Sequence, residues 1–411
     1  MIYHDGGGIT LDKQELLDYF IENYHPRQEI VYRLPMSVPI SEFWPEELLC
    51  RRSRAVTLPL RTADGESFWY VPTGKLLQAG DSLSQAARYE NTNTLPQYGH
   101  DESIIDEAYY SSAIEGAYST LAKAHELIRS GRHPETIDER MIINNYEALR
   151  FVLDHLDTPI NEALVLEVAR ILTDGTLTPD TKPGWRDGPV QVVSGRQEVV
   201  YAAPDADKIR PMLDDLFAFL ALDDIHPVIR ACAVHIYFVT IHPLFDGNGR
   251  TARALAYMIL LQAGYDFFRQ LPISGLLVQE RSRYYKSIRA SQDPANGNDF
   301  TYFMEYYTDM LFRSISDIHH HMDGKMKVEQ LRKEAAALAS ADRLCAGLEW
   351  LYRKDFQSIT ADKWKDQFKV SFETARKDLI WLAEKGYLSI RISGHRKYFD
   401  VINHRSTPGA T

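Results

Sequence analysis

The chain has 411 residues, 45% of them hydrophobic and 25% charged, which is typical of folded globular proteins with two or three domains. Its formal net charge of −11 excludes a protein that binds polyanions over its whole surface. Three cysteines far apart predict neither disulfides nor a zinc site, and the lack of a leader pattern or an 18-residue apolar run predicts a cytoplasmic protein with no membrane contact.

Residues 1–100 mix one helical pattern with strand-like pieces, so we expect an N-terminal extension of mixed α/β structure. Across residues 101–312, apolar side chains recur at helical spacing in one segment after another. The segment 182–204 interrupts this series, because two β-prone runs there flank SGRQ and predict a hairpin. The predicted fold class is therefore mainly α, with one β-hairpin in its helical core.

Residues 313–340 form a charged helical pattern, and we expect a linker helix there. Residues 341–405 combine three helical patterns with two strand patterns, the order typical of a winged helix-turn-helix domain. Residues 341–411 carry 13 Lys and Arg against 9 Asp and Glu, unlike the acidic remainder, which indicates a separate contact surface for DNA or protein. The candidate contacts are Arg376, Lys377, Arg391, His395, Arg396 and Lys397.

The most informative stretch is HPLFDGNGRTAR at 242–253. An EF-hand loop counted from Asp246 is excluded, because Arg250, Thr251 and Tyr257 stand at positions that need other residues. GNGRTA also fits the loose dinucleotide pattern GxGxxG/A, but that fold needs repeated βαβ units and the neighbouring segments are helical. Neither alternative explains the stretch.

A phosphate cradle at a helix start explains it better. Gly247 and Gly249 allow the backbone to curl close to an anion at the free N–H groups of the helix. Arg250 and Arg253 lie three residues apart, so they share a helical face and suit separate phosphates of a triphosphate.

Two further side chains supply chemistry. Asp246 is a hard oxygen ligand for Mg²⁺ beside phosphates. His242 stands just before the cradle, and its neutral form accepts a proton at cellular pH. Together these residues predict nucleotide transfer to a hydroxyl.

The stretch resembles the signature of the Fic family, HxFx(D/E)GNGRxxR, with Leu244 where the family usually has Phe. The resemblance implies a Fic-type helical core and transfer of AMP from ATP to a Tyr, Thr or Ser hydroxyl of a protein. By motif position it implies the following roles: His242 as general base, Asp246 as Mg²⁺ ligand, Gly247, Asn248 and Gly249 as anion hole, Arg250 as phosphate contact, and Arg253 as partner of the γ-phosphate.

A second stretch, SSAIEG at 111–116, resembles the family's inhibitory pattern (S/T)xxxE(G/N), with Ser111, Glu115 and Gly116 at its defined positions. Because it precedes the core, it resembles the class with an N-terminal inhibitory helix, expected near 105–128. The resemblance implies that Glu115 pairs with Arg253 and blocks productive ATP binding.

The 182–204 hairpin resembles the family's flap, whose free edge at Val190, Gln191, Val192 and Val193 would align a target segment by β-augmentation. The expected partner is a protein that bears a hydroxyl side chain, with the chain itself as one candidate and homodimerisation open. Two alternative functions remain open here. One is removal of AMP by the same site, and the other is a DNA-binding transcriptional regulator in which the Fic core is ancillary.

Overall fold

The computed structural model describes residues 12–92, 100–178, 181, 183–193, 198–353, 356–393 and 396–402. By its packing the chain divides into two units, Met1–Ser314 and Ile315–Thr411, and each is treated by itself below. The finer division at residues 100, 312 and 340 stays a prediction. His395, one of the candidate contacts in the wing, lies outside the described residues.

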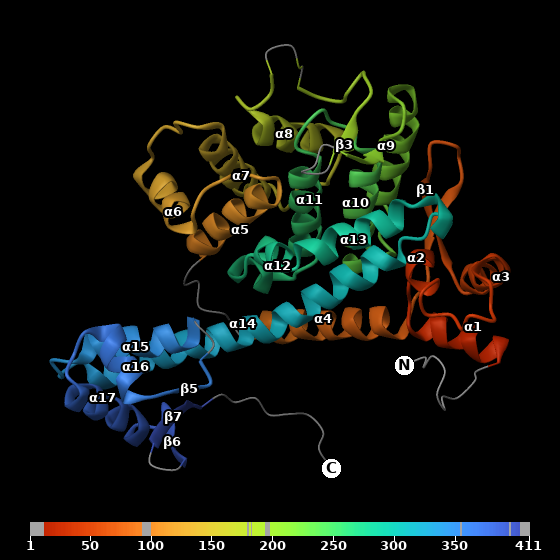
Figure 1. Cartoon of the computed structure of the whole chain (residues 1–411). Helices are drawn as coiled ribbons and strands as arrows, with labels where there is room; N and C mark the ends of the chain where they lie inside the picture. The colour runs from red at the N-terminus through yellow and green to blue at the C-terminus, as the bar shows by residue number, and fades with distance from the viewer. Residues whose placement is uncertain are drawn as a thin grey trace. The chain divides into compact units, whose positions relative to one another are not determined.

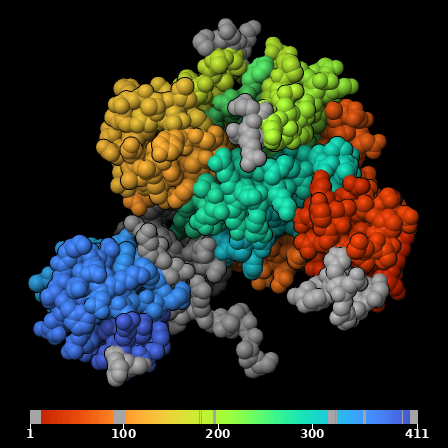
Figure 2. Space-filling view, viewed as in Figure 1, coloured from red at the N-terminus to blue at the C-terminus, as the bar shows by residue number. Residues whose placement is uncertain are grey.

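The described N-terminal part of the first unit contains four helices and a two-stranded sheet. Its elements are α1 (Lys13–Glu22), α2 (Arg27–Ile30), α3 (Ile40–Ser53), β1 (Val56–Arg61), β2 (Ser67–Tyr70) and α4 (Gly74–Thr92). The fully buried Arg51 of α3 pairs with Glu47 at 2.6 Å and donates to the Tyr302 hydroxyl at 2.8 Å. These contacts attach the N-terminal part to the start of a later helix, as the red and cyan surfaces show in Figure 2.

The rest of the first unit is a helical core with one hairpin. Its elements are α5 (His100–Ile114), α6 (Leu121–Ser130), α7 (Ile137–Asp154), α8 (Glu162–Thr173), β3 (Gln191–Val193), β4 (Val199–Ala202), α9 (Ala206–Leu220), α10 (Pro227–Ile241), α11 (Asn248–Gln262), η1 (Asp266–Gln270), α12 (Ile273–Gln279), α13 (Arg281–Gln292), η2 (Pro294–Asn296) and the beginning of α14 (Thr301–Ala335).

Helices α10 and α11 form the centre of this core (Figure 1). Every residue from Ala231 to Ile241 in α10 is buried, and so is every residue from Arg250 to Leu261 in α11. A helix that is buried on all sides must be covered by others. Here α9 packs against α10, while α5, α7 and α8 pack against α11.

The connection between the two central helices is short and sharply bent. His242 ends α10 in the left-handed conformation, with φ of 51° and ψ of 56°, and Gly247 precedes α11 with φ of 83°. The chain therefore reverses direction between the two helices, which pack against each other. The motif 242–253 forms this loop and the beginning of α11.

The predicted inhibitory segment is two helices rather than one. Apolar spacing favoured a continuous helix near 105–128, but α5 ends at Ile114 and α6 begins at Leu121. Gly116 breaks the helix with φ of 99°, and Thr120 caps the next one by accepting from the Lys123 N–H. Glu115 consequently lies in the turn just after α5.

The predicted hairpin is present: β3 pairs antiparallel with β4, with Gln191 opposite Ala202. In the second unit the end of α14 packs with α15 (Ala341–Arg353), β5 (Ser358–Ile359), α16 (Ala361–Phe368), α17 (Phe372–Glu384), β6 (Leu388–Ser393) and β7 (Arg396–Val401). The sheet order is β5-β7-β6, antiparallel throughout. The expected mainly helical fold is confirmed, whereas the name winged helix stays an interpretation of this element order.

The second unit has a well-filled core around Trp364, whose side chain is fully buried. Asp378 of α17 is 5% exposed. It accepts from Arg343 at 2.7 Å and from the Trp364 indole at 3.1 Å. Within the described part of both units, no helix is long and apolar enough to cross a membrane.

Candidate active site

His242 is held at the end of α10 by its own helix. Its N–H donates to Phe238 O at 2.9 Å, and its Nδ1 lies 3.3 Å from Val239 O. If Nδ1 donates to that carbonyl, Nε2 is the nitrogen that can accept a proton. Burial lowers the pKa of His242 below its ordinary value, although the Val239 carbonyl and Glu115 act in the opposite direction. The neutral form is thus favoured.

The loop after His242 is fixed by an amide side chain. Asn248 accepts from the Leu244 N–H at 2.9 Å and donates to Leu244 O at 2.8 Å. The Leu244 side chain is 3% exposed, so it fills the apolar position at which the family signature usually has Phe. Asn248 therefore acts on the loop backbone through its side chain, while its own N–H lies at the start of α11.

Arg250 is buried and holds the loop to a neighbouring helix. Its side chain is fully buried, and it donates to Leu172 O at 2.8 Å and to Asp246 Oδ2 at 2.9 Å. The Asp246 carboxylate is 51% exposed. Arg250 thus orients Asp246 toward the outside of the loop, and its expected contact with phosphates stays a prediction.

Arg253 joins α11 to the end of α5. Its Nε donates to Ser111 Oγ at 3.0 Å, and its Nη2 donates to Ser111 O at 2.9 Å and to Glu115 Oε1 at 2.8 Å. The Arg253 side chain is 3% exposed and that of Glu115 is 31% exposed. Three of the predicted site residues from distant parts of the chain therefore meet in one hydrogen-bonded group.

The charges of this group reinforce each other. Burial alone would raise the pKa of Glu115, but the Arg253 guanidinium, together with Arg250 and His242, outweighs burial and holds the pKa below the usual glutamate range. Burial opposes the charged form of Arg253 as well, yet Glu115 raises the pKa of that guanidinium above its ordinary value. The pair is accordingly ionised at neutral pH.

Glu115 lies directly against the start of α11. A Cβ placed on Gly249 would clash with Glu115 Oε1 and would lie 3.1 Å from its Cδ. Only glycine leaves room for the carboxylate there. The first N–H groups of a helix have no acceptor within the helix, and α11 has no side-chain cap. The carboxylate thus occupies the place where an anion is favoured.

One donor in this group is left over. Arg253 Nη1 is buried and has no hydrogen-bond partner among the described residues. A buried unpaired guanidinium nitrogen costs free energy unless a ligand satisfies it. A Cβ placed on Gly249 would lie 3.2 Å from this nitrogen, so the donor stands beside the helix start. The residues present therefore fit a further anionic oxygen.

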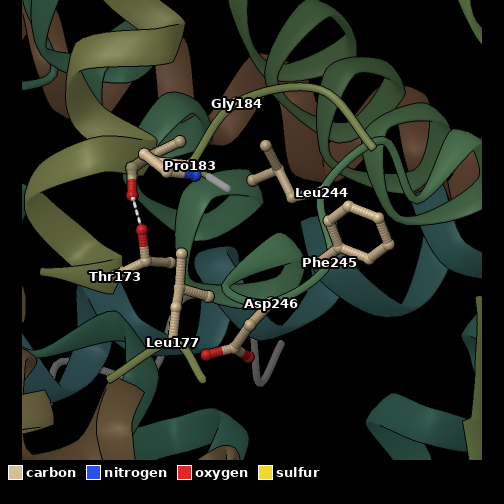
Figure 3. Close-up of a pocket in the computed structure, with 8 residues that line it drawn as sticks. Thr173, Leu177, Pro183, Gly184, Leu244, Phe245 and Asp246 are labelled. Atoms are coloured by element: carbon tan, nitrogen blue, oxygen red, sulfur yellow. Dashed lines mark hydrogen bonds between the residues drawn. The ribbon is translucent and has the colours of Figure 1, made fainter. Parts of the chain in front are cut away.

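A small, open hollow adjoins the motif loop (Figure 3). Thr173 and Leu177 form one wall, Leu244 and Phe245 form another, and Asp246 lies at the rim. The remaining lining residues are Ala169, Pro183 and Gly184. The hollow is therefore lined by the motif loop, by the end of α8 with Leu177, and by the segment that leads into the hairpin.

Of the predicted flap edge, Gln191, Val192 and Val193 form β3, whereas Val190 directly precedes the strand and is half-buried. Gln191 and Val193 are exposed, and Val192 is half-buried opposite Tyr201. The hairpin is attached to α10 by Tyr201, whose hydroxyl donates to Thr240 O at 2.7 Å. A second attachment is Arg186, which no sequence pattern singles out. Neither residue carries a spacing signal, because each acts on backbone carbonyls that only the fold brings near.

Among the described residues, no group of three or more His, Cys, Asp and Glu side chains is arranged to hold a metal ion. A single exposed carboxylate remains at the motif, that of Asp246. Mg²⁺ is commonly held by one or two carboxylates together with phosphate oxygens, so this donor set fits Mg²⁺ only alongside a nucleotide.

Comparisons with known proteins show which sequences and folds this chain resembles. Residues 159–260 match the Fic/DOC family. The protein adenylyltransferase Fic of Aedes aegypti is 27% identical over 248 residues, which cover 59% of this chain and 46% of that protein. The protein adenylyltransferase fic-1 of Caenorhabditis elegans is 28% identical over 241 residues, with coverages of 56% and 44%. The chain thus spans about half the length of the curated relatives it matches.

One solved structure has the same fold over most of the chain. The crystal structure of a Fic family protein from Desulfovibrio desulfuricans G20 superposes with a TM-score of 0.53 and 21% sequence identity. The superposition covers 81% of this chain and 98% of that one. This likeness confirms the expected helical fold and concerns the fold alone.

Proposed function

We propose, from the match of residues 159–260 to the Fic/DOC family, that this chain is an autoinhibited protein adenylyltransferase. It transfers AMP from ATP to a Tyr, Thr or Ser hydroxyl of a protein, its own chain included. The observation that carries the proposal is the position of Arg253. This buried cation pairs with Glu115 at the start of α11, and one of its donors has no partner in the described part of the chain.

In the proposed reaction, His242 Nε2 takes the proton of the target hydroxyl. The hydroxyl oxygen attacks the α-phosphorus of ATP, and the bond from that phosphorus to the oxygen bridging to the β-phosphate breaks. Pyrophosphate leaves, and AMP stays on the hydroxyl oxygen. The lowered pKa of His242 supports this role, because the base is neutral before the reaction.

The proposed phosphate site is built around the start of α11. The N–H groups of Asn248 and Gly249, reached by the bend at Gly247, receive the α- and β-phosphates. Asp246 would hold Mg²⁺, which neutralises phosphate charge when bound. Arg250 holds Asp246 in place, and its charge adds to the positive field at the phosphates.

Inhibition follows from competition for Arg253. In the resting chain Glu115 takes the guanidinium that the γ-phosphate needs, and its carboxylate fills the space beside Gly249. A hydrogen bond between charged groups contributes about 1.5–3 kcal/mol. We therefore expect about 10- to 100-fold restraint of productive ATP binding, since about 1.4 kcal/mol corresponds to a factor of ten.

The first prediction tests reaction and inhibition together. Glu115→Gly is expected to gain the mass of one AMP on incubation with ATP and Mg²⁺, at a rate about 10- to 100-fold above that of the wild-type chain. His242→Ala in the same background is expected to abolish the gain. Intact-mass analysis and α-labelled ATP measure both.

Glu135→Gly is a matched control, because Glu135 is 75% exposed and pairs with Arg132 rather than with an arginine of α11. Equal labelling of the wild-type chain and Glu115→Gly would contradict the inhibitory role. Absence of labelling in every variant would contradict the transferase activity.

The same site also suits removal of AMP, with Glu115 positioning a water molecule. The self-labelled Glu115→Gly chain offers a substrate for this reaction. Release of AMP when unlabelled wild-type chain is added would favour removal as the main activity, and a stable label would favour transfer. The flap edge at Val190–Val193 as a docking strand, a homodimer and a cytoplasmic location stay predictions.

A further inference from the structure

Arg186 lies in the irregular segment before the hairpin, and it is 3% exposed. Its backbone N–H donates to Pro243 O at 2.9 Å. Its Nε donates to His242 O at 2.7 Å, and one Nη reaches Ile241 O at 3.4 Å. One residue therefore contacts three consecutive backbone carbonyls at the end of α10 and the start of the motif loop.

The same guanidinium also reaches both ends of the hairpin. Its Nη1 donates to Gly188 O at 2.7 Å, just before β3, and its Nη2 donates to Pro204 O, just after β4. Since the guanidinium is rigid and planar, these hydrogen bonds fix the positions of the two ends of the hairpin relative to His242. The hairpin and the motif loop therefore share one anchor.

The acceptors of this guanidinium are all backbone carbonyls. A buried charge is costly unless hydrogen bonds compensate it, so the bonds form as a set. One of these hydrogen bonds ends on His242, whose left-handed backbone conformation is unfavourable for a residue with a Cβ. Such a conformation persists only when its surroundings enforce it, and the bond to His242 O fixes the ψ angle of that residue.

From this geometry we propose that Arg186 is a positioning residue for the transfer reaction. It holds the strained backbone of His242 and both stems of the β3–β4 hairpin in one hydrogen-bonded unit. The proposal rests on the proposed function, in which His242 is the base and the hairpin lies near the target hydroxyl.

The electrostatics of His242 offer a readout that does not need activity. The charged groups that act on its ring are Glu115 and Asp246, which raise its pKa, and Arg186, which lowers it alongside burial. Removing the Arg186 charge is therefore expected to raise the pKa of His242. A side chain that only fills space would leave the titration unchanged.

The experiment compares Arg186→Met and Arg186→Lys in the full chain with Glu115→Gly as the parent. Arg129→Met is the matched control, since Arg129 is a half-exposed arginine of α6 that pairs with Glu102. The first measurement is the pH titration of His242 by NMR of labelled histidine, with His242→Ala to assign the signal. The second is the rate of amide hydrogen exchange at Val190–Val193. The third is the kcat and the KM for ATP in self-labelling.

For Arg186→Met we expect a raised His242 pKa and faster exchange in β3. We also expect kcat to fall about ten-fold or more with the KM for ATP changed less than about two-fold, because misplacing a base costs rate rather than nucleotide binding. Arg186→Lys keeps the charge but not the fork of donors, so it is expected to retain the pKa and lose the slow exchange.

Arg186 variants that match Arg129→Met in the titration of His242 and in the amide exchange of β3 would overturn the proposal. If Arg186→Met does not fold, Arg186→Lys decides through the exchange of β3. If the Glu115→Gly parent shows no labelling, the proposed function fails, while titration and exchange still decide the role of Arg186.

Discussion

At the residue scale, the candidate base and the inhibitory carboxylate both have shifted pKa values. Burial lowers the pKa of His242, and the Arg253 guanidinium lowers that of Glu115. The first shift keeps the imidazole neutral, and the second keeps the inhibitory carboxylate charged. Both protonation states are those that the proposed function needs at neutral pH.

These shifts predict the pH dependence of labelling. His242 has a folded-state pKa below its unfolded value, so its neutral form is favoured and is lost only as pH falls through the folded pKa. Without Glu115, which raises that pKa, the loss moves further toward acid. We therefore expect the labelling rate of Glu115→Gly to stay constant well below pH ~6.5, the ordinary histidine value. Rates measured between about pH 5 and 8 at saturating ATP check this. A half-maximal rate above pH ~6.5 would contradict it.

At the element scale, the end of α5 is held by two hydrogen bonds from α13. Arg281 donates to Ile114 O at 2.7 Å, and the Tyr285 hydroxyl donates to the same carbonyl at 3.1 Å. This is the last residue of α5, directly before Glu115. Since the final carbonyls of a helix have no partner within the helix, these two bonds stabilise the turn that carries the inhibitory carboxylate.

We expect Arg281→Ala to loosen this turn and to raise basal self-labelling of the otherwise wild-type chain. The lost bond is worth about 1 kcal/mol, which corresponds to an increase of about five-fold. Arg283→Ala is the control, because Arg283 lies on the same helix, is 59% exposed and pairs only with Glu280 among the ion pairs described. Equal basal labelling of the two variants would contradict a role of the hydrogen bonds from α13 in inhibition.

At the scale of the whole molecule, the two units differ in charge. The balance of residues 341–411 is positive in a chain with a net charge of −11. Several of its arginines are already paired. Arg343 binds Asp378, Arg391 binds Asp400 at 2.7 Å, and Arg376 lies 3.7 Å from Glu373. Paired cations release few counterions from DNA, so the basic excess weakens as evidence for DNA binding.

We accordingly expect no stable complex between the full chain and duplex DNA at about 200 mM salt, and only weak, salt-sensitive binding at about 50 mM. A gel shift at both salt concentrations checks this. Replacement of Arg376 and Lys377 by Glu distinguishes a specific surface from general attraction. A complex that survives high salt and is lost in this variant would favour the DNA-binding regulator.

Much of the fold and of the motif could be predicted from the sequence. Helical spacing located most of the helices, and the two β-prone runs located the hairpin, because burial on one face imposes a period on local sequence. The motif 242–253 indicated a phosphate site from residue types alone, since glycines and arginines at a helix start have few other uses together. The match of residues 159–260 to the Fic/DOC family agrees with the resemblance seen in the motif, whereas the roles of the individual residues stay predictions.

Contacts between residues far apart in the sequence are determined by the tertiary structure. Glu115 and Arg253 are separated by 138 residues, and only the packing of α5 on α11 brings their side chains together. Hydrophobic periodicity likewise does not predict the break at Gly116, the burial of Arg250 or the backbone contacts of Arg186. Sequence patterns record which face of an element is buried, but the partner of a buried charge depends on contacts between distant elements, and these are set only when the whole core packs.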